Sequence, residues 1–538
     1  MIDPVFEPDD AEAATPARAG ARSIFAQRAM IDPVFEPDDA EAAALAQAGI
    51  RAIFEWLATP LSLQPTDELS PLRTHLAALR EIPATAHQRA DALEQLYTRS
   101  LSVVDKLIPT LKNVTLPIPR KTRHVVRSMQ DLLQALAEDT QATLDNLDEH
   151  LIRGLRQAQD LALWRSLHAL AQHLLISDLV ASPASPGIWQ QLHQSFRTAS
   201  RLQLADSTPQ GAPCSLRQTY YAALLLGCAQ PASFTSREIA FVAEYLKRFA
   251  DRAEPLPEAA PESPGAFWIH SLRDTPAFAC SRKTAPSDPD IHYFSCDRLA
   301  ILLETQLEAL DAGRTPQQIE LPEFAATPAG HGVLRRLANY WGHPGKRRFP
   351  RRRQNYRAAL CSGLDSLWHL FQGDDTVETD VSSWMITNES PDGYTVMHVS
   401  GKTGKLRVGD ITAIRTESGN DWQICLVRWA LSENPEHLEL GLQILASRAV
   451  PAILALPSET GDSENEALLP VLILPEIPML RPSQTLVAPS GRLLDQHKKL
   501  VLVINQGNIE VREMKATQLD EQTGSVEVFS IEPDQQPY

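Results

Sequence analysis

The stretch that decides the fold of the second half of this chain reads Trp384-Met385-Ile386-Thr387-Asn388-Glu389-Ser390-Pro391-Asp392-Gly393-Tyr394-Thr395-Val396-Met397-His398-Val399. Aromatic and β-branched residues are frequent on both sides of a segment that contains Pro, Asp and Gly. Residues of these kinds favour strands, and Pro, Asp and Gly between two such runs are typical of a turn. The stretch therefore predicts two neighbouring strands of an antiparallel sheet.

Further short runs of the same kind follow at spacings of about ten residues. Strands are expected over 411–415, 423–429 and 438–444, and Gly, Asp, Asn and Pro turns separate them. This pattern is typical of a small antiparallel barrel. A second β-rich segment follows, with strands expected near 469–474, 484–488, 499–504, 508–514 and 525–531.

The first half of the chain has a helical period instead. Apolar residues recur at spacings of three and four from about residue 69 to residue 310, and each set predicts one apolar helix face. The clearest sets are Val125, Met129, Leu132 and Leu136; Leu163, Leu167, Leu170 and Leu174; and Ile239, Val242, Leu246 and Phe249. The sequence thus predicts an antiparallel α-helical array. An irregular α-solenoid fits the same periodicities and would offer a concave surface to a protein partner.

The expected fold class is multidomain α + β: an all-α helical array, then a small antiparallel β-barrel, then a C-terminal β-rich extension. The N-terminal segment 1–60 contains a duplication, because residues 1–14 (MIDPVFEPDDAEAA) recur as residues 30–43, and it is expected to be disordered. The remaining expected divisions are a helical domain over 61–250, a linker with further helices over 251–341, a barrel over 342–450 and a C-terminal β-rich domain over 451–538.

Composition excludes several classes of protein. The 538 residues carry a net charge of −17, which disfavours a general nucleic-acid binder. No apolar run approaches the roughly 18 residues that a membrane-spanning helix needs, so no integral membrane segment and a cytoplasmic location are expected. The six cysteines form no Cys-x-x-Cys pair, and no metal or redox cofactor is expected. No spacing of acidic or nucleophilic residues marks a catalytic site, so an enzyme is not expected.

A basic cluster precedes the predicted barrel and interrupts the acidic background. Seven of the twelve residues from 346 to 357 are Lys or Arg, in what reads as a flexible joint. The arginine side chain offers a planar fork of donors that suits phosphate oxygens and the O6/N7 edge of guanine. Asn388 and Ser390 add short hydrogen-bonding groups, and Gly393 would permit a positive φ or the close approach of a ligand. Together these residues predict a ligand that carries phosphate and guanine.

The pairing of Arg-x-x-x-Arg with a later Asn388-x-Ser390-x-x-Gly393 resembles the PilZ domain, a bacterial receptor module for cyclic di-GMP. The resemblance covers roughly residues 340–450 and does not extend to the helical half. It implies a six-stranded barrel whose N-terminal arginine loop folds over the ligand. In that picture Arg347 and Arg351 hold guanine and phosphate groups, and the Asn388–Gly393 turn contacts the other guanine.

The register of the arginine pair stays open in the sequence. Arg348 with Arg352, and Arg353 with Arg357, also satisfy the spacing. The candidate ligand-binding residues are therefore Arg347, Arg348, Arg351, Arg352, Asn388, Ser390 and Gly393. The gap before Asn388 is longer than the family pattern, and residues 373–375 are expected to widen a hairpin there.

The resulting hypothesis is an effector in which cyclic di-GMP binds the barrel and the helical array engages an unidentified protein partner. One alternative is a helical interaction scaffold with a degenerate barrel that binds no ligand. Another is a nucleic-acid binder that uses residues 346–357, which the acidity of the chain disfavours. The sequence names neither the partner nor the output.

Overall fold

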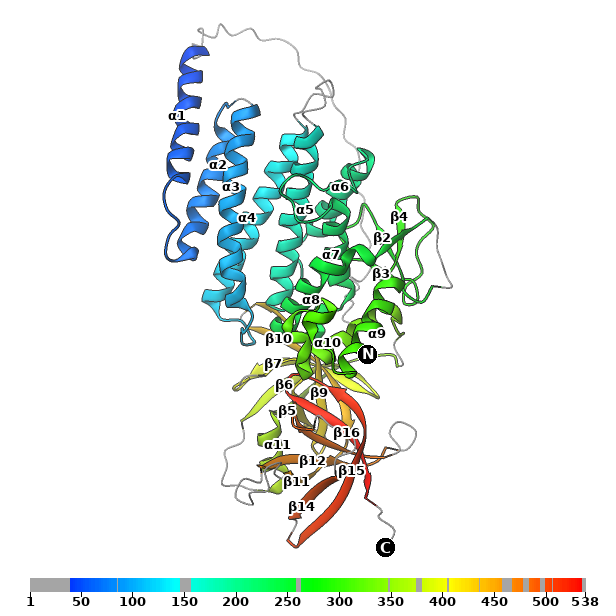
Figure 1. Cartoon of the computed structure of the whole chain (residues 1–538). Coiled ribbons are helices and arrows are strands. Elements are labelled where there is room, and N and C mark those ends of the chain that lie inside the picture. Colours follow the sequence, from blue (N-terminus) through cyan, green and yellow to red (C-terminus); the bar gives the residue numbers. More distant parts are fainter. Residues whose placement is uncertain are drawn as a thin grey trace, which may run out of the picture.

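Helices and barrels occupy opposite ends of the molecule (Figure 1). The computed structural model describes residues 39–84, 86–145, 156–257, 263–346, 349–373, 380–403, 406–434, 436–456, 467–477, 483–493, 499–505 and 507–534. Within these residues no helix is long and apolar enough to cross a bilayer.

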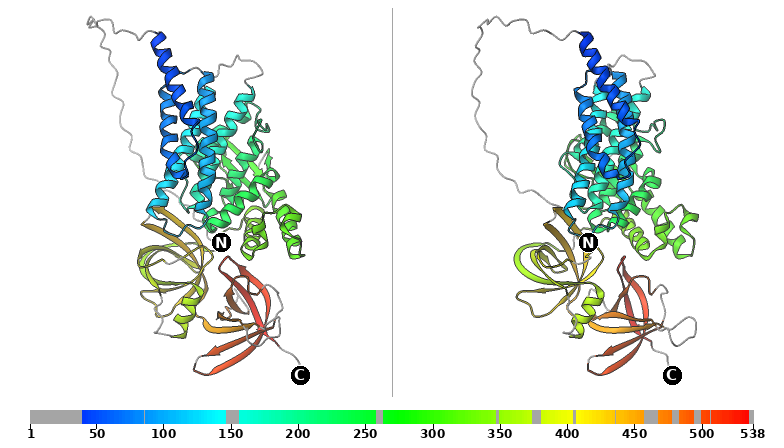
Figure 2. Two further views of the ribbon diagram at one scale, coloured as in Figure 1. Left: turned by 60° about the vertical axis from the view of Figure 1, so that its left-hand side comes forward. Right: turned by 90° about the vertical axis from the view of Figure 1, so that its left-hand side faces the viewer.

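The helical half is an array in which successive helices pack side by side (Figures 1 and 2). The predicted apolar faces are confirmed, and Met129, Leu132 and Leu136 are fully buried in one cluster. The helices are α1 (Asp39–Leu57), α2 (Leu69–Glu81), α3 (Ala86–Leu107), α4 (Arg120–Asp145), α5 (Arg156–Leu179), α6 (Ile188–Arg201), α7 (Leu216–Cys228) and α8 (Ser236–Phe249).

The expectation of disorder over 1–60 is wrong for residues 39–57, which form α1. Ile50 and Ile53 of this helix are buried in the helical core, so the second copy of the duplicated segment leads into the folded domain. The first copy, residues 1–14, lies outside the described residues.

The segment expected to be linker and helices contains a small sheet as well. Its strands are β1 (Glu254–Leu256), β2 (Ala266–His270), β3 (Phe278–Ala279) and β4 (Ile291–Ser295), in the order β1-β4-β2-β3. The many prolines of this segment concealed such short strands. Helices α9 (Asp297–Asp311) and α10 (Pro328–Gly342) follow and lead to the basic cluster.

The predicted antiparallel barrel is confirmed as a closed barrel with the strand order β10-β7-β6-β5-β8-β9. Its strands are β5 (Arg352–Ser362), β6 (Val381–Ser390), β7 (Gly393–Ser400), β8 (Ile411–Thr416), β9 (Gln423–Asn434) and β10 (His437–Ala446). Trp384, Val396 and Leu440 are among the fully buried residues of its interior.

Two elements at the start of this barrel were missed by the sequence analysis. Part of the expected flexible joint is strand β5, because the basic residues Arg352 and Arg353 already pair with β6. The long gap before Asn388 contains helix α11 (Leu364–Gln372), so a widened hairpin does not account for it. Residues 374–379 lie outside the described residues.

The C-terminal β-rich segment forms a second closed barrel, with the order β11-β12-β13-β16-β15-β14. Its strands are β11 (Val450–Leu456), β12 (Ala467–Leu474), β13 (Gln484–Pro489), β14 (Lys499–Asn505), β15 (Ile509–Gln522) and β16 (Val526–Pro533). One apolar cluster joins both barrels through α11, and the indole nitrogen of Trp368 donates to the carbonyl of Ala452 at 2.8 Å. The two barrels are therefore packed together and not merely tethered.

The tip of the β9–β10 hairpin docks onto the helical array. The backbone N–H of Ser432 donates to the carbonyl of Ala181 at 2.7 Å. The Arg123 guanidinium donates to the carbonyls of Ser432 at 2.8 Å and Glu433 at 2.7 Å. Because Arg123 and Ser432 are both buried, these bonds fix the first barrel against α4 and the end of α5.

Candidate functional site

The basic cluster and the Asn388–Gly393 turn meet through the pairing of β5 with β6. In this antiparallel register Arg352 lies opposite Glu389, and Arg353 lies opposite Asn388. Directly opposed residues of such a pair have Cβ atoms about 5 Å apart. The two exposed arginines and the half-buried Asn388 thus hold neighbouring positions on the barrel wall. Because successive strand residues alternate, Arg353 and Asn388 share one face of the sheet, and Arg352 and Glu389 share the other.

The turn between β6 and β7 is held by its own side chains. The Ser390 hydroxyl lies 2.7 Å from a carboxylate oxygen of Asp392 and 3.2 Å from the carbonyl oxygen of Gly393, and either oxygen can accept its proton. A register shift between Ile386 and Asn388 interrupts the ladder just before the turn. Such irregularities redirect side chains and are frequent beside binding sites.

Gly393 has a different role from the one expected. It does not adopt a positive φ; it begins β7 and pairs with both Ser390 and Gln443. A Cβ atom here would lie 2.1 Å from the carbonyl oxygen of Leu442 on β10. Glycine is therefore required by the close approach of the barrel's own backbone.

An acidic side chain lies within the same area. The Glu389 carboxylate accepts hydrogen bonds from Tyr356 at 3.1 Å and Gln354 at 3.2 Å. Burial, reinforced by Glu389, raises the pKa of Tyr356 and raises the pKa of Tyr394 to about 12. Both phenols therefore stay neutral to a higher pH than an ordinary tyrosine and act as hydrogen-bonding groups.

Arg351 lies just before β5 and acts electrostatically on β10. Burial raises the pKa of Glu439, and the positive charges of His437 and Arg351 lower it in part. Glu439 pairs across the barrel ladder with Leu431, the residue that precedes the docked Ser432. The charge of Arg351 thus acts on a strand of the hairpin that contacts the helical array.

The structure brings together only part of the predicted set. Arg352, Asn388, Ser390 and Gly393 lie on the adjoining strands β5, β6 and β7, and Arg351 directly precedes β5. Arg347 and Arg348 lie outside the described residues. The alternative pair Arg353 and Arg357 is separated by about 13 Å along an extended strand. Its two members also face different surroundings, because Arg357 lies opposite Met385 and lines a separate hollow with Arg415.

Four further residues of this area were not among the predicted ones: Gln354, Tyr356, Glu389 and Glu439. Arg353 had entered the sequence analysis only as half of an alternative arginine pair. A signal for β5 was present, because Tyr356, Ala358 and Leu360 are apolar at a period of two and pack into the barrel interior. No sequence signal pointed to Glu439, which belongs to a strand 86 positions further along than Arg353.

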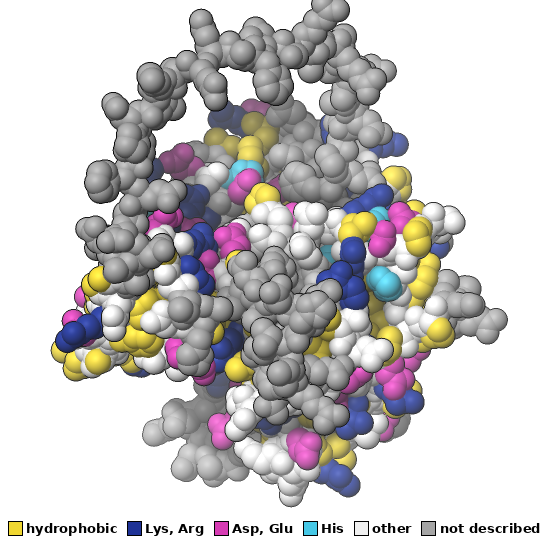
Figure 3. Space-filling model, turned by 90° about the horizontal axis from the view of Figure 1, so that it is seen from above, with side chains coloured by type: hydrophobic (Ala, Val, Ile, Leu, Met, Phe, Trp, Pro, Cys, Tyr) yellow, Lys and Arg dark blue, Asp and Glu magenta, His cyan; other side chains and the backbone are white. Residues whose placement is uncertain are grey.

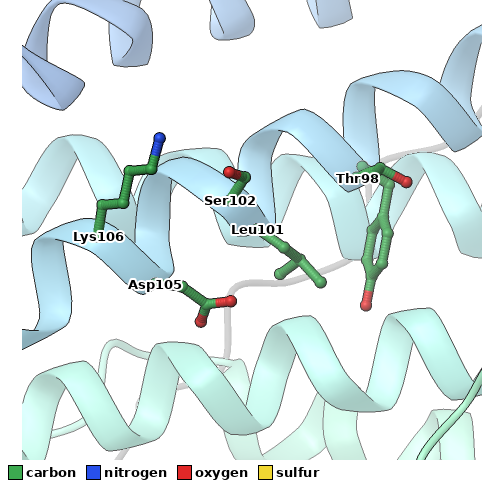
Figure 4. A pocket seen from close by; sticks show the side chains of 6 residues that line it. Thr98, Leu101, Ser102, Asp105 and Lys106 are labelled. Carbon is green, nitrogen blue, oxygen red and sulfur yellow. The ribbon is translucent and has the colours of Figure 1, made fainter. Parts of the chain in front are cut away.

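A hollow on helix α3 is unlike this area in charge. It is lined by Tyr97, Thr98, Leu101, Ser102, Asp105 and Lys106. In Figure 4, Leu101 and Asp105 point toward the neighbouring helix, whereas Lys106 points away. With one acidic and one basic side chain, the hollow does not concentrate charge for an anionic ligand.

Comparison with known proteins extends the family resemblance to most of the chain. Residues 51–259 match the N-terminal domain of the cyclic-di-GMP receptor FimW, residues 371–451 match its middle PilZ domain, and residues 455–533 match the FimW C-terminal β-barrel domain. The PilZ resemblance is confirmed. The helical half, to which the sequence analysis assigned no family, is recognised as well.

The chain is also similar to a curated protein, the cyclic-di-GMP receptor FimW of Pseudomonas aeruginosa strain PAO1. The two are 22% identical over 405 residues, which cover 60% of this chain and 65% of that protein. The chain therefore matches slightly less than two thirds of its relative. The PilZ match begins at residue 371, so it includes the Asn388–Gly393 turn but not the basic cluster.

Proposed function

We propose that this chain, whose residues 371–451 are a PilZ domain of the FimW type, is a receptor for cyclic di-GMP. The observation that carries the proposal is the β5–β6 register, which sets Arg352 and Arg353 across from Glu389 and Asn388. The name of the similar protein, a cyclic-di-GMP receptor, supports the same ligand.

Each side of the proposed site suits one part of this ligand. Arginine forks bind phosphate oxygens or the O6/N7 edge of guanine with two parallel hydrogen bonds. We assign this role to Arg351 and Arg352, together with Arg347 and Arg348 of the preceding segment, and we add Arg353. Asn388 and Ser390 supply short donors and acceptors for the second guanine, while Gly393 keeps the turn against β10.

The proposed output is a change in how the barrel engages the helical array and, through it, a protein partner. A dianionic ligand competes with Glu439 for the positive charge of Arg351. Glu439 pairs with Leu431 across the ladder. The next residue after Leu431 is Ser432, which is hydrogen-bonded to Ala181 and Arg123. Ligand binding would thus alter charge beside the hairpin whose tip docks on α4 and α5.

Titration calorimetry of the whole chain tests the ligand assignment. We expect saturable binding of cyclic di-GMP and much weaker binding of cyclic di-AMP, because adenine offers an N6 donor where guanine offers O6. A single-stranded oligonucleotide is the control, and a nucleic-acid binder would prefer it with a steep salt dependence. Equal affinity for cyclic di-GMP, cyclic di-AMP and the oligonucleotide would overturn the proposal.

A second candidate function is a helical interaction scaffold with a barrel that has lost its ligand. Two observations favour it: the Glu389 carboxylate lies within the proposed site, and the packing of the barrel alone accounts for Gly393. No heat of binding with cyclic di-GMP, together with a stable protein complex formed by residues 39–342, would select this alternative.

A further inference from the structure

Among the described residues, the first part of strand β15 has a partner strand on one side only. On one side, residues 509–515 pair with β14, whereas pairing with β16 on the other side starts at Met514. Among the described residues, the bond from the Asp534 N–H to the Glu513 carbonyl is the last backbone bond on this second side. Figure 1 shows the β14–β15 hairpin at the end of the molecule remote from the helices.

The outer face of this edge is apolar. Ile509 is 74% exposed and Val511 is 60% exposed. The strand registers place Val511 beside Val503 of β14 and Val503 beside Ile453 of β11. An apolar row thus crosses three strands and stops at the open edge, where backbone groups are available to another strand.

The sequence of the edge is complementary to itself. When two copies pair antiparallel about Val511, Glu510 of each copy lies opposite Arg512 of the other. Within one copy these side chains already form an ion pair at 2.6 Å, so the dimer would hold a group of four alternating charges. Centring the pair on Glu510 or on Arg512 would instead oppose like charges, which is destabilising.

We propose that residues 509–513 pair with the same segment of a second copy of this chain. The pairing continues the β15 ladder across a two-fold axis and joins two apolar rows, each of Ile453, Val503 and Val511. A contact of five strand residues from each copy is small, so the dimer should be in reversible equilibrium with the monomer and depend on protein concentration. It lies in the C-terminal barrel and is independent of the proposed nucleotide site.

Sedimentation velocity over a range of protein concentrations tests the proposal. We expect a reversible monomer–dimer equilibrium for the wild type, and a dimer dissociation constant raised roughly tenfold or more by Glu510→Arg or Arg512→Glu, because each reversal opposes like charges twice. The double variant Glu510→Arg/Arg512→Glu restores complementarity and should restore the dimer. Such a rescue would show that the single variants lose the dimer because of opposed charges and not because of misfolding.

Three results would overturn the proposal. The first is a wild type that is monomeric at every concentration, and the second is a dimer that both single variants leave unchanged. The third is a monomer that dimerises only after deletion of residues 535–538, because the chain itself would then cover the edge.

Discussion

At the residue scale, the pairing of Arg353 with Asn388 gives the sharpest test of the arginine register. Arg353→Ala should weaken cyclic di-GMP binding by about 1–3 kcal/mol, the cost of one bidentate contact, or roughly 5- to 150-fold in affinity. Arg357→Ala should leave affinity unchanged, because Arg357 lies opposite Met385 and lines a different hollow. Titration calorimetry measures both variants, with Arg415→Ala as the control. If both variants lost the same affinity for cyclic di-GMP, Arg353 and Arg357 would be the ligand-binding pair, which the structure disfavours.

Gly393 provides a second residue-scale prediction, on stability. Gly393→Ala should lower the free energy of unfolding by about 1–3 kcal/mol, the usual cost of overpacking, because its Cβ would press on the carbonyl oxygen of Leu442. Thermal unfolding without ligand measures the effect. Gly524→Ala is the matched control, since its Cβ would meet only an ordinary contact at 3.7 Å. A Gly393→Ala variant that melts like the wild type but fails to bind nucleotide would instead assign the glycine to the ligand.

The sequence predicted the turn between β6 and β7 but could not give the structural reason for its glycine. Asn388, Ser390 and Gly393 stood out by spacing alone. The close approach of Leu442 to Gly393 depends on barrel closure between residues about fifty positions apart, and nothing local in the sequence records it. The arginine register likewise depends on the irregular pairing between Arg353 and Tyr356.

At the element scale, strand β10 and the arginine segment interact through charge. Glu439→Gln removes a negative charge that competes for Arg351, so it should raise the affinity for cyclic di-GMP several-fold. Calorimetry on this variant tests the effect, with Glu436→Gln as the control, because Glu436 pairs with Arg120 at the surface. A lower affinity for Glu439→Gln would show that Glu439 supports the site and does not compete with it.

The same residue predicts a dependence of stability on pH. Burial raises the pKa of Glu439 in the folded chain, so the folded state binds its proton more tightly than the unfolded state does. The contribution of Glu439 to the free energy of unfolding should therefore rise as pH falls through this raised pKa, and level off below the ordinary glutamate range. Chemical denaturation of wild type and Glu439→Gln at several pH values measures the difference. Parallel pH profiles for the two proteins would contradict the assignment.

Elements with a long, regular period were predictable, and short or interrupted ones were not. The apolar faces of α4, α5 and α8 followed directly from spacings of three and four. Strand β5 was concealed because its first residues are basic, and α11 has only nine residues. Strands β1 to β4 are two to five residues long, which is too short for a periodic pattern.

At the scale of the whole molecule, the docking of the β9–β10 hairpin on the helical array is the proposed route between ligand and partner. Lysine and arginine side chains are interspersed with acidic ones on the described surface seen from above in Figure 3. Binding of a partner to this surface would therefore not depend on one large patch of a single charge sign. The interface around Arg123 and Ser432 joins residues more than 300 positions apart, so periodicity and motif spacing could not reveal it.

Removing the hydrogen bonds of Arg123 should loosen the first barrel from the helical array. Arg123→Met keeps much of the side-chain volume but removes these donors from the buried carbonyl of Ser432 and from the carbonyl of Glu433, at a cost of about 1–3 kcal/mol. Hydrogen exchange should then be faster at the hairpin tip and at the first turn of α4. Arg120→Met is the control, because its ion pair with Glu436 is exposed. Unchanged exchange in Arg123→Met would contradict a fixed interface.

The central claim is that the basic cluster and the Asn388–Gly393 turn form one cyclic di-GMP site on the barrel. Calorimetric titration of cyclic di-GMP into the wild type, Arg351→Ala, Ser390→Ala and the double variant tests it most directly. The wild type should bind saturably, each single variant should lose affinity, and the double variant should lose less than the sum, because both residues hold one ligand. Unchanged affinity in both single variants would contradict the claim.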